Sequence, residues 1–468
     1  MKKILFLTIL AIQNIAAQII SYDNSFASNG KFTITNASNQ HYINLTDTTD
    51  GSLYFTYAKE SNIGTTFLSK LNTNGTIDSS FGNSGEVSIP YFSPGFPSIL
   101  KKQTDGKLLV LGFYEDGTAI TRVLPNGQID LSFGINGTSK IPYIGMGFNA
   151  DSFGIHLQNN KLIVYGTAFD SNYHLLNHSL IYRLNENGTI DQSFGNNGSI
   201  NTKGNFIFVD NQSNIISFIS NVINTNVYPY GALEKYNSSG QVFSDFGNNG
   251  VLAFNSSLGM VNTAFMDSNN YIVCANINNE IFRIHPTGVY DTSFIFDNNA
   301  PPFNDGNLSL YINEKNGNYY TSWITGSTGE NILISKLTST GSIDPSFNYS
   351  ENTTAPLIIN QMIINDNNIF ATRGNQILKF SLNNPTLATI NPLTANNTSI
   401  SFENPVRQNL IYQSKEKISK IELYSSAGKI VKVLKDSFSP VSELPKGIYT
   451  AKITFENGSI TTKKLIKN

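Results

Sequence analysis

The histidines best placed to share a metal ion are His174 and His178, which stand four residues apart. On a helix this spacing puts both rings on one face, as in the zinc-binding H-E-x-x-H motif. Here Leu175 follows the first histidine in place of a glutamate, and residues 170–179 are mostly polar. These residues therefore predict a loop between two strands rather than a metal site. The remaining histidines stand alone in the sequence: His41, His156 and His285.

Calcium binding is the second chemistry to consider, because aspartates recur along the chain. They occupy equivalent places in a repeated stretch: Asp78, Asp130, Asp191, Asp291 and Asp344. Calcium loops crowd several oxygen ligands into about a dozen residues, whereas each repeat offers a single recurring carboxylate. An aspartate can also accept hydrogen bonds from backbone N–H groups just downstream and so form an Asx turn. We interpret these aspartates as structural corner residues.

Their recurrence also argues against catalysis, since a catalytic group is needed once and a scaffold residue in every repeat. The sequence shows no nucleophile elbow, no phosphate-binding loop and no paired catalytic carboxylates. We therefore expect no catalytic, cofactor-binding or metal-binding residues, and a protein that is not an enzyme.

The aspartates belong to a stretch that is clearest at Leu184–Gly198, LNENGTIDQSFGNNG, and is repeated at Leu71–Gly85 and Val123–Gly137. Drifted copies occupy residues 236–250, 284–297 and 337–347. The turn glycine recurs at intervals of 48 to 61 residues: Gly75, Gly127, Gly188, Gly240, Gly288 and Gly341. A period near fifty indicates propeller blades or an array of repeats.

Each residue type in this stretch has a structural interpretation. The Asn-Gly pair supplies the positive-φ positions of a tight type I′ turn. A phenylalanine three residues after the aspartate is expected to join one sheet to the next, and the glycine after it lets the chain turn sharply. The clearest copies give these structural repeat residues: Asp78, Phe81, Gly82, Asp130, Phe133, Gly134, Asp191, Phe194 and Gly195. The phenylalanine series continues with Phe246, Phe294 and Phe347.

Two apolar strands joined by a polar turn accompany every copy, as in Ser98–Leu100 and Lys107–Leu111 around Asp105-Gly106. A third strand ends each time in a basic residue followed by an apolar one. The basic residues are Lys70, Arg122, Arg183, Lys235, Arg283, Lys336 and Lys379. This alternation favours a solvated strand face or a salt bridge to an aspartate of a neighbouring blade; a positive ring on one face is the alternative.

The two ends of the repeat region complete each other. The seventh unit breaks off at Asn383–Pro385, whereas Asp23–Thr35 carries a closing half with no first half before it. A circular array needs this arrangement, because the first strand then pairs into the last blade and no bare sheet edge remains. Alternating apolar runs and the lack of helical periodicity agree. We predict an all-β chain with a seven-bladed β-propeller, closed by its N-terminal strand, over residues 18–388.

Composition bounds the compartment and the partners. A formal net charge of −2 with 14% charged residues gives no electrostatic footprint for nucleic acid. Residues 1–17 have the basic start, apolar centre and small-residue end of a secretory signal peptide. No stretch reaches the roughly 20 apolar residues of a membrane span, so we expect no transmembrane segment. The single cysteine, Cys274, excludes an internal disulfide and is interpreted as a small buried hydrophobe.

The repeats resemble the delta-60 repeat, a family of secreted bacterial β-repeat proteins with the signature L-N-x-x-G-x-x-D-x-S-F-G-x-x-G. The resemblance is specific in the three clearest copies. Phe243 takes the aspartate place in the fourth copy, and Ile295 and Asn348 replace the glycine after the phenylalanine in the fifth and sixth. We expect remodelled corners there. The resemblance implies the propeller fold and a secreted context, and no activity.

After a polar linker, residues 389–399, the repeat ends, and short alternating strands predict a small β-sandwich over residues 400–468. This segment resembles the C-terminal sorting domain (type A) of cargo of the type IX, or Por, secretion system. The resemblance rests on Asn404, Pro405, Gly428, Lys429, Gly447, Ile448, Tyr449, Lys463 and Lys464. It implies recognition by an outer-membrane translocon. An immunoglobulin-like accessory module is the alternative.

We therefore expect a non-enzymatic binding or interaction protein that is secreted or attached to the outer-membrane surface of a Gram-negative bacterium. Its partners would be the type IX translocon, through residues 400–468, and a surface polysaccharide or a protein as ligand. Tyr- and Asn-rich loops at residues 168–179 and 224–231 suit such a ligand. The alternatives are a secreted hydrolase or lyase, acting on polysaccharide or peptide from a propeller face, and a purely structural surface-layer component.

Overall fold

The computed structural model describes residues 19–383 and 400–467, apart from gaps at 36, 38–42, 48–49, 60–61, 90–97, 115–116, 143, 146–152, 171–173, 221–227, 259, 277, 279, 297–305, 326–330, 353–358, 366, 403–404, 415, 426–428, 435–437 and 457–459. The expected signal peptide 1–17, the linker 389–399, Asn404 and Gly428 lie outside the described residues. The chain divides into two compact units, Met1–Asn384 and Pro385–Asn468. Within the described residues, no helix is long and apolar enough to cross a membrane.

The described part of the first unit forms seven antiparallel sheets. The first three in chain order are built as follows. One contains β3 (Asn44–Asp47), β4 (Leu53–Lys59), β5 (Asn62–Leu71) and β6 (Glu86–Ile89). The next contains β7 (Ile99–Lys102), β8 (Leu108–Tyr114), β9 (Gly117–Val123) and β10 (Thr138–Pro142). The third contains β11 (Ile144–Gly145), β12 (Phe153–Gln158), β13 (Lys161–Phe169), β14 (Leu175–Leu184) and β15 (Ser199–Thr202).

The other four sheets repeat this plan. They are β16 (Phe206–Val209), β17 (Ile215–Ile219), β18 (Ala232–Tyr236) and β19 (Val251–Ala253); β20 (Val261–Met266), β21 (Ile272–Asn276) and β22 (Ile281–Ile284); and β23 (Gly306–Lys315), β24 (Asn318–Thr325), β25 (Asn331–Leu337) and β26 (Ile343–Asn352). The last contains β27 (Ile359–Ile364), β28 (Asn368–Arg373) and β29 (Gln376–Asn383). Both β1 (Ile19–Tyr22) and β2 (Lys31–Thr33) pair with β29.

The second strand of each sheet carries the core, because neighbouring sheets cover both of its faces. Leu108–Leu111 in β8 are fully buried on consecutive positions, and so are most residues of β17. Continuous apolar runs of this kind are typical of strands covered on both faces. The only helical element of the described residues is a short 3-10 turn, η2 (Ser256–Leu258). The predicted all-β class is therefore confirmed.

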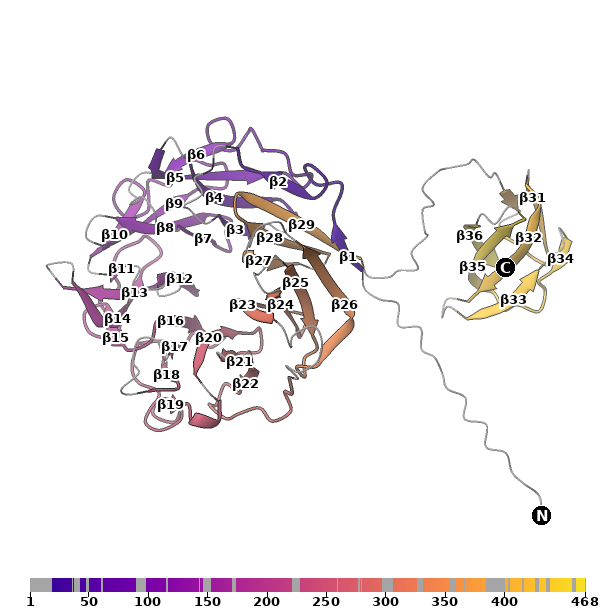
Figure 1. The fold of residues 1–468 in the computed structure, drawn as a ribbon. Helices are drawn as coiled ribbons and strands as arrows, with labels where there is room; N and C mark the ends of the chain where they lie inside the picture. The colour runs from indigo at the N-terminus through magenta and orange to yellow at the C-terminus, as the bar shows by residue number, and fades with distance from the viewer. Residues whose placement is uncertain are drawn as a thin grey trace, which may run out of the picture. The chain divides into compact units, whose positions relative to one another are not determined.

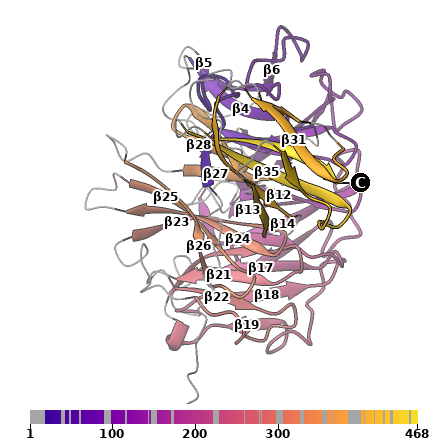
Figure 2. The same ribbon diagram turned by 90° about the vertical axis from the view of Figure 1, so that its right-hand side faces the viewer.

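The sheets of the first unit are arranged around a common centre (Figure 1). Their first strands lie nearest to this centre and contact one another in the cyclic order β3, β7, β12, β16, β20, β23, β27 and again β3. In the side view of Figure 2, strands such as β17, β18 and β19 lie next to one another as their pairing requires. This arrangement is propeller-like.

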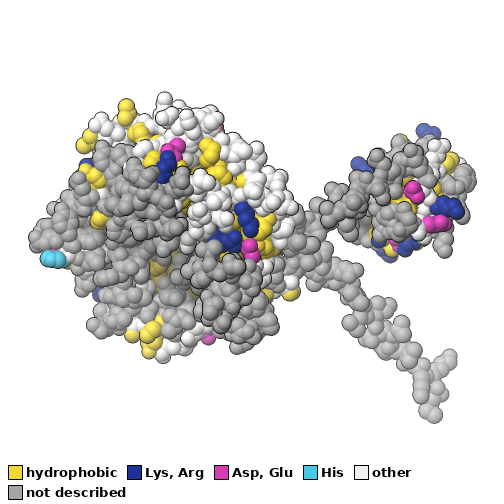
Figure 3. Space-filling view, turned by 45° about the horizontal axis from the view of Figure 1, so that its top comes forward, with side chains coloured by type: hydrophobic (Ala, Val, Ile, Leu, Met, Phe, Trp, Pro, Cys, Tyr) yellow, Lys and Arg dark blue, Asp and Glu magenta, His cyan; other side chains and the backbone are white. Residues whose placement is uncertain are grey.

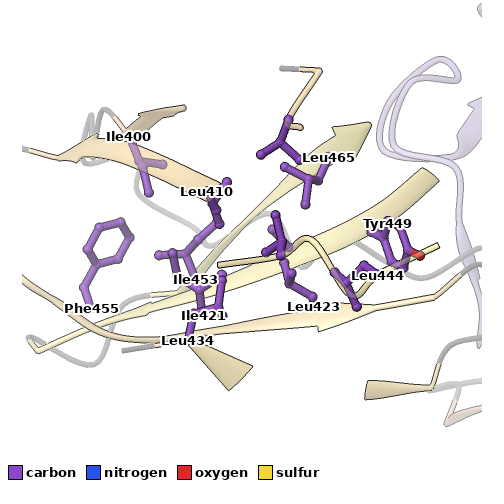
Figure 4. Close-up of a cluster of buried hydrophobic side chains, with 13 residues drawn as sticks. Ile400, Leu410, Ile421, Leu423, Leu434, Leu444, Tyr449, Ile453, Phe455 and Leu465 are labelled. Carbon is purple, nitrogen blue, oxygen red and sulfur yellow. The ribbon is translucent and has the colours of Figure 1, made fainter. Parts of the chain in front are cut away.

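The second unit is a small sandwich of two sheets. One contains β30 (Ile400–Phe402), β31 (Asn409–Ser414) and β34 (Phe438–Pro440); the other contains β32 (Ile418–Tyr424), β33 (Ile430–Leu434), β35 (Gly447–Phe455) and β36 (Ile460–Lys467). In β35 buried and more exposed residues alternate, as expected for a sheet with one covered face. Figure 4 shows Leu410, Ile421 and Ile453 pointing toward one another in this core.

Candidate functional site: the corner motif and the C-terminal unit

The repeated stretch of the sequence is the connection between the third and fourth strands of a sheet, which we call the corner motif; its best example is residues 123–137. In it Asp130 Oδ1 accepts hydrogen bonds from the backbone N–H of Ser132 at 3.1 Å and from its hydroxyl at 2.6 Å. The backbone N–H of Phe133 donates to the carbonyl of Asp130. Asp78, Asp191, Asp291 and Asp23 bind the serine two residues downstream in the same way.

The turn that opens the motif differs from the predicted type I′ turn. Gly127 has φ of +88°, whereas Asn126 is absent from the described residues with positive φ. The Gly127 N–H donates to the carbonyl of Leu124, and the Leu124 N–H donates to the carbonyl of Gln128. This is a type I turn followed by a left-handed glycine, which makes a three-residue hairpin loop. The asparagine contributes instead through its side chain, whose Oδ1 accepts the N–H of Gln128.

A buried ion pair holds the corner against the third strand. Arg122 Nε lies 2.8 Å from Asp130 Oδ2, and both side chains are almost fully buried. Burial alone would raise the pKa of Asp130, but the hydrogen bonds from Ser132 and the charge of Arg122 outweigh it and lower that pKa. The equivalent pairs are Lys70–Asp78 at 3.0 Å, Arg183–Asp191 at 2.7 Å, Arg283–Asp291 at 2.5 Å, Lys336–Asp344 at 3.1 Å and Lys379–Asp23 at 2.9 Å.

These pairs correct the expectation of a solvated basic strand face or of a bridge to a neighbouring blade. The aspartate follows its partner by eight residues in the same sheet, because the corner folds back onto the third strand. Only Lys379 and Asp23 are far apart in sequence, and they join β29 to the corner that follows β1. The repeated cations are therefore neutralised locally. Several Lys and Arg side chains visible in Figure 3 likewise lie directly beside Asp or Glu side chains.

The same corner also bonds to the next sheet. Arg122 Nη1 donates to the carbonyl of Glu186 at 2.5 Å, and the backbone N–H of Gly134 donates to the carbonyl of Asn187 at 2.7 Å. Both acceptors lie in the opening turn of the following corner motif. Equivalent bonds from basic residues are Arg183 to Ser238, Lys235 to Pro286 and Arg283 to Ser339. Those from the residue after the phenylalanine are Ala27 to Asn74, Gly82 to Asn126, Gly195 to Ser239 and Ile295 to Thr340.

The phenylalanine of each corner fills the space between the two sheets. The recurring rings are all buried: Phe26, Phe81, Phe133, Phe194, Phe246, Phe294 and Phe347. Next to them stand the turn glycines of the following corner, where a Cβ on Gly188 would lie 2.9 Å from the ring of Phe133. Gly82, Gly134 and Gly195 have φ between +54° and +60°, which allows the sharp bend after the phenylalanine.

Three copies depart from the pattern. In the fourth copy Phe243 stands where an aspartate is expected, and Lys235 lies 3.6 Å from Asp210 of the β16–β17 turn instead. In the fifth copy Ile295 replaces the glycine, yet its backbone N–H still donates to the carbonyl of Thr340. For Asn348, only its backbone pairing with Ser335 is described. Backbone bonds thus persist where side chains drift.

The histidine pair and the cysteine occupy separate places. His174 is exposed beside Asp170, with Nδ1 and Oδ2 3.0 Å apart, whereas His178 lies on strand β14. The expected loop therefore ends at Leu175, and the described residues contain no group of three metal-binding side chains. Cys274 is buried in β21, and burial raises the pKa of its thiol.

In the C-terminal unit, the described residues chosen from the sequence lie between β30 and β31, between β32 and β33, and along β35 and β36. Pro405 is exposed, and the N–H of the buried Val406 donates to the carbonyl of Ile466 at 2.7 Å. Tyr449 is buried, with its hydroxyl bonded to the carbonyl of Pro445 at 2.6 Å. The exposed members are Lys429, Gly447, Ile448, Lys463 and Lys464.

One cluster escaped the sequence analysis. Glu351 on β26 accepts the hydroxyl of Tyr22 at 2.7 Å, that of Tyr349 at 3.1 Å, and Arg373 Nη1 at 2.7 Å. Burial and the hydrogen bond to Glu351 raise the pKa of Tyr22 to about 12. The cluster joins β1, β26 and β28. No repeated pattern in the sequence marks Glu351. Asp23, by contrast, could have been recognised from the sequence as a corner aspartate, since the D-x-S-F pattern recurs at Asp23–Phe26.

Comparison with known families agrees with this division. Residues 402–468 match the secretion system C-terminal sorting domain. Residues 103–133 and 157–194 match the beta-propeller family known as domain of unknown function DUF5122, and both matched segments end at a corner phenylalanine. No match was found among curated proteins.

The solved structures that match this chain are remote in sequence. A catalytically inactive virginiamycin B lyase from Staphylococcus aureus with quinupristin is 15% identical, with a TM-score of 0.43 over 75% of this chain and 98% of that one. A streptogramin B lyase is 13% identical, with a TM-score of 0.47 over 75% and 97%. YCF48 from Cyanidioschyzon merolae is 11% identical, with a TM-score of 0.41 over 72% and 94%. The two family matches identify the chain as a propeller-type protein with a C-terminal sorting domain of the type IX secretion system.

Proposed function

We propose that this chain is a non-enzymatic binding or interaction protein, which the type IX secretion system delivers to the cell surface or the medium. The sorting domain supports the export route. The binding role rests on one observation: the described corner aspartates and the repeated basic residues form ion pairs with one another that stabilise the sheets. The repeated polar residues therefore have a structural role. Function is then left to the residues that differ between repeats.

The proposal includes a closed ring of seven blades. It is supported by the cyclic contacts of the innermost strands and by the pairing of β1 and β2 with β29. In this arrangement the N-terminal residues supply the outer strand of the last blade. Closure removes the bare edge that strand β29 would otherwise present to other chains.

The proposed route begins with cleavage of a signal peptide after Ala17 and crossing of the inner membrane. The outer-membrane translocon then recognises the sorting domain, which is removed or used for surface attachment. The ligand is a surface polysaccharide or a protein, bound by loops that vary between blades. The Tyr- and Asn-rich candidates at residues 168–179 and 224–231 lie partly outside the described residues.

Fractionation of the native host tests the export route. Antibodies against the propeller and against residues 400–468 would follow the protein in cells with and without a working type IX translocon. We expect the propeller at the surface or in the medium, and retention in the periplasm when the translocon is missing. Export that is unaffected by loss of the translocon would contradict the assignment of the C-terminal unit.

A binding assay separates the non-enzymatic role from the enzymatic alternative. The purified mature chain would be incubated with surface polysaccharide from the host, and both co-sedimentation and the size distribution of the polysaccharide would be measured. We expect co-sedimentation with unchanged polymer size. Shortened chains would instead show a hydrolase or a lyase.

A further inference from the structure

The innermost strands place one residue each at an equivalent position around the centre of the first unit. The equivalence follows from register: in every sheet this residue pairs with the second-strand residue that itself pairs with the repeated basic residue of the third strand. Thr46, for example, pairs with Tyr54, which pairs with Lys70, and Lys101 pairs with Leu109, which pairs with Arg122. The set, which we call the channel ring, is Thr46, Lys101, His156, Phe208, Phe265, Asn313 and Ile363.

Burial separates each channel-ring residue from the residue that precedes it. Every ring residue is half-buried, whereas the residue before each one is buried: Leu45, Leu100, Ile155, Ile207, Ala264, Ile312 and Met362. Side chains alternate along a strand, so one set packs between sheets and the other is left partly open at the centre. The channel ring is therefore one part of the innermost strands that can meet a ligand.

The channel ring is not symmetric in chemistry. In cyclic order, Thr46, Lys101 and His156 form a polar arc, and Phe208 and Phe265 form an apolar one. Lys101 is the one lysine or arginine of the ring. Burial, and to a smaller extent the charge of Lys101, lowers the pKa of His156 to about 3. His156 is therefore neutral and adds no second charge to the ring.

A cavity of about 280 Å³ adjoins the polar arc. Ring members Thr46, Lys101, Asn313 and Ile363 line it, together with Leu45, Leu100, Glu314, Gln361, Met362 and Ile364. Its volume lies near the lower end of small-molecule sites. Apolar and polar walls meet there, which is the usual composition of such a site.

Most polar groups of the cavity already have partners. Asn313 Nδ2 donates to the carbonyl of Met362 at 2.8 Å, and Gln361 exchanges two bonds with the backbone of Leu45. Glu314 accepts the N–H of Gly317 at 2.6 Å and that of Ser268 at 3.2 Å.

Lys101 differs from these residues, because no ion pair or hydrogen bond to its ammonium occurs among the described residues. Burial lowers its pKa. An ammonium that is partly withdrawn from water and has no counter-ion is disfavoured, and a carboxylate would supply both the opposite charge and a strong acceptor.

We propose that this cavity binds the carboxylate of a small organic acid, with Lys101 as its counter-ion. The inference rests on the binding function proposed above and names its ligand class. The half-buried apolar side chains of Ile363 and Ile364, which line the cavity, would contact the body of the acid. Because Lys101 stands at a ring position that other sheets fill with Thr, His, Phe, Asn or Ile, the repeat architecture does not require a lysine there.

Calorimetry on the full mature chain tests the site with matched pairs of probes. Glucuronate would be compared with glucose, and N-acetylphenylalanine with its amide; the two pairs distinguish a sugar acid from an amino-acid-derived one. We expect at least one acid to bind about tenfold more tightly than its neutral counterpart. Equal binding of acid and neutral probe in both pairs would overturn the inference.

Two variants assign the effect to one side chain. Lys101→Met keeps the apolar stem and should abolish the preference for the acid, whereas Lys102→Met changes the next residue, which does not line the cavity, and should retain it. A second measurement uses the unmodified protein: amine labelling of Lys101, read by mass spectrometry, should slow when the preferred acid is bound. Labelling that the acid does not change, or a preference that survives in Lys101→Met, would refute the role of Lys101.

The polysaccharide assay described above keeps the two proposals apart. If the chain co-sediments with polysaccharide but shows no preference for an acid, the channel site is wrong and the binding function stands. If neither is observed, the channel site is wrong and polysaccharide is excluded as the ligand of the proposed binding function.

Discussion

Asp130 joins three parts of its corner at once: the downstream serine, the third strand through Arg122, and the carbonyl acceptor of the Phe133 N–H. Its partner Arg122 in turn reaches the next sheet through the carbonyl of Glu186. A buried pair of this kind adds little over an apolar pair, but losing one partner leaves an unpaired buried charge. Single substitutions should therefore be severe here.

Replacing Asp130 by Asn should lower the free energy of unfolding by about 3 kcal/mol, because Arg122 is left buried without a counter-ion. Asn keeps the acceptor for Ser132, so the loss belongs mainly to the charge. Urea unfolding of the purified protein measures it. Asp245→Asn, at an exposed position with no ion pair in the described structure, is the matched control and should stay within about 0.5 kcal/mol. Equal effects of the two variants would contradict the assigned role.

The contribution of Asp130 to the free energy of unfolding should depend on pH. The pKa of Asp130 is lowered from the ordinary aspartate value of 3.8, so its contribution to stability is fully present above that value. The contribution is lost as pH falls below 3.8 through the folded-state pKa. The difference in unfolding free energy between the wild type and Asp130→Asn should therefore be constant from pH 7 to about 5 and shrink below about pH 4. Urea titrations at several pH values would measure it, and a constant difference down to pH 3 would be inconsistent with this account.

At the scale of elements, the corner motif connects each sheet to the next through contacts that leave no room for a side chain. A Cβ on Gly127 would lie 2.3 Å from the backbone nitrogen of Gly82. Gly51 has a similar φ, +83° against +88°, but its nearest neighbour beyond the chain would be a methyl group of Thr73 at 3.7 Å. The two glycines therefore separate backbone strain from close packing between sheets.

Gly51→Ala should destabilise by about 1 kcal/mol, the cost of a left-handed alanine. Gly127→Ala should cost at least about 2 kcal/mol more, since the backbone of two adjacent sheets must move apart. Thermal and urea unfolding of both variants provide the comparison. If the two alanines cost the same, the corner would not be a tight contact between sheets.

For the first unit as a whole, residues from opposite ends of the chain complete one sheet. Ile19–Tyr22 pair with residues 380–383, and Lys31–Thr33 pair with residues 376–378. Phe26, 1% exposed, packs with Phe370, and Glu351 receives the hydroxyl of Tyr22. Removing the N-terminal strands would expose a sheet edge and open the core at once.

Deleting residues 19–33 should lower stability by more than about 5 kcal/mol, because the loss of one buried phenylalanine alone costs roughly 3–5 kcal/mol. A synthetic peptide of residues 18–35, added in excess, should restore part of the melting temperature by binding the open edge. A scrambled peptide of the same composition is the control. Equal stabilisation by both peptides would argue against strand complementation.

Local chemistry made much of this predictable. The aspartate bonds to a serine two residues away, and the turn glycine and the phenylalanine recur at fixed distances from it, so the repeated stretch could be interpreted without knowing the fold. The hairpin type was wrong, because Asn-Gly suits two turns and the loop length decides between them. The sorting domain was recognisable because its order of short strands and turn residues is itself the family pattern.

What the sequence determined by itself was the all-β class, the period, the corner residues and the presence of the sorting domain, since all of these depend on neighbours along the chain. The tertiary structure decided which groups meet across sheets. Lys235 pairs with Asp210, because the aspartate of its own corner is missing. Glu351 accepts hydrogen bonds from Tyr22 and Arg373, and Lys101 lines the cavity. These meetings depend on register and on the order of sheets around the ring, because a shift of one residue would turn each side chain to the opposite face.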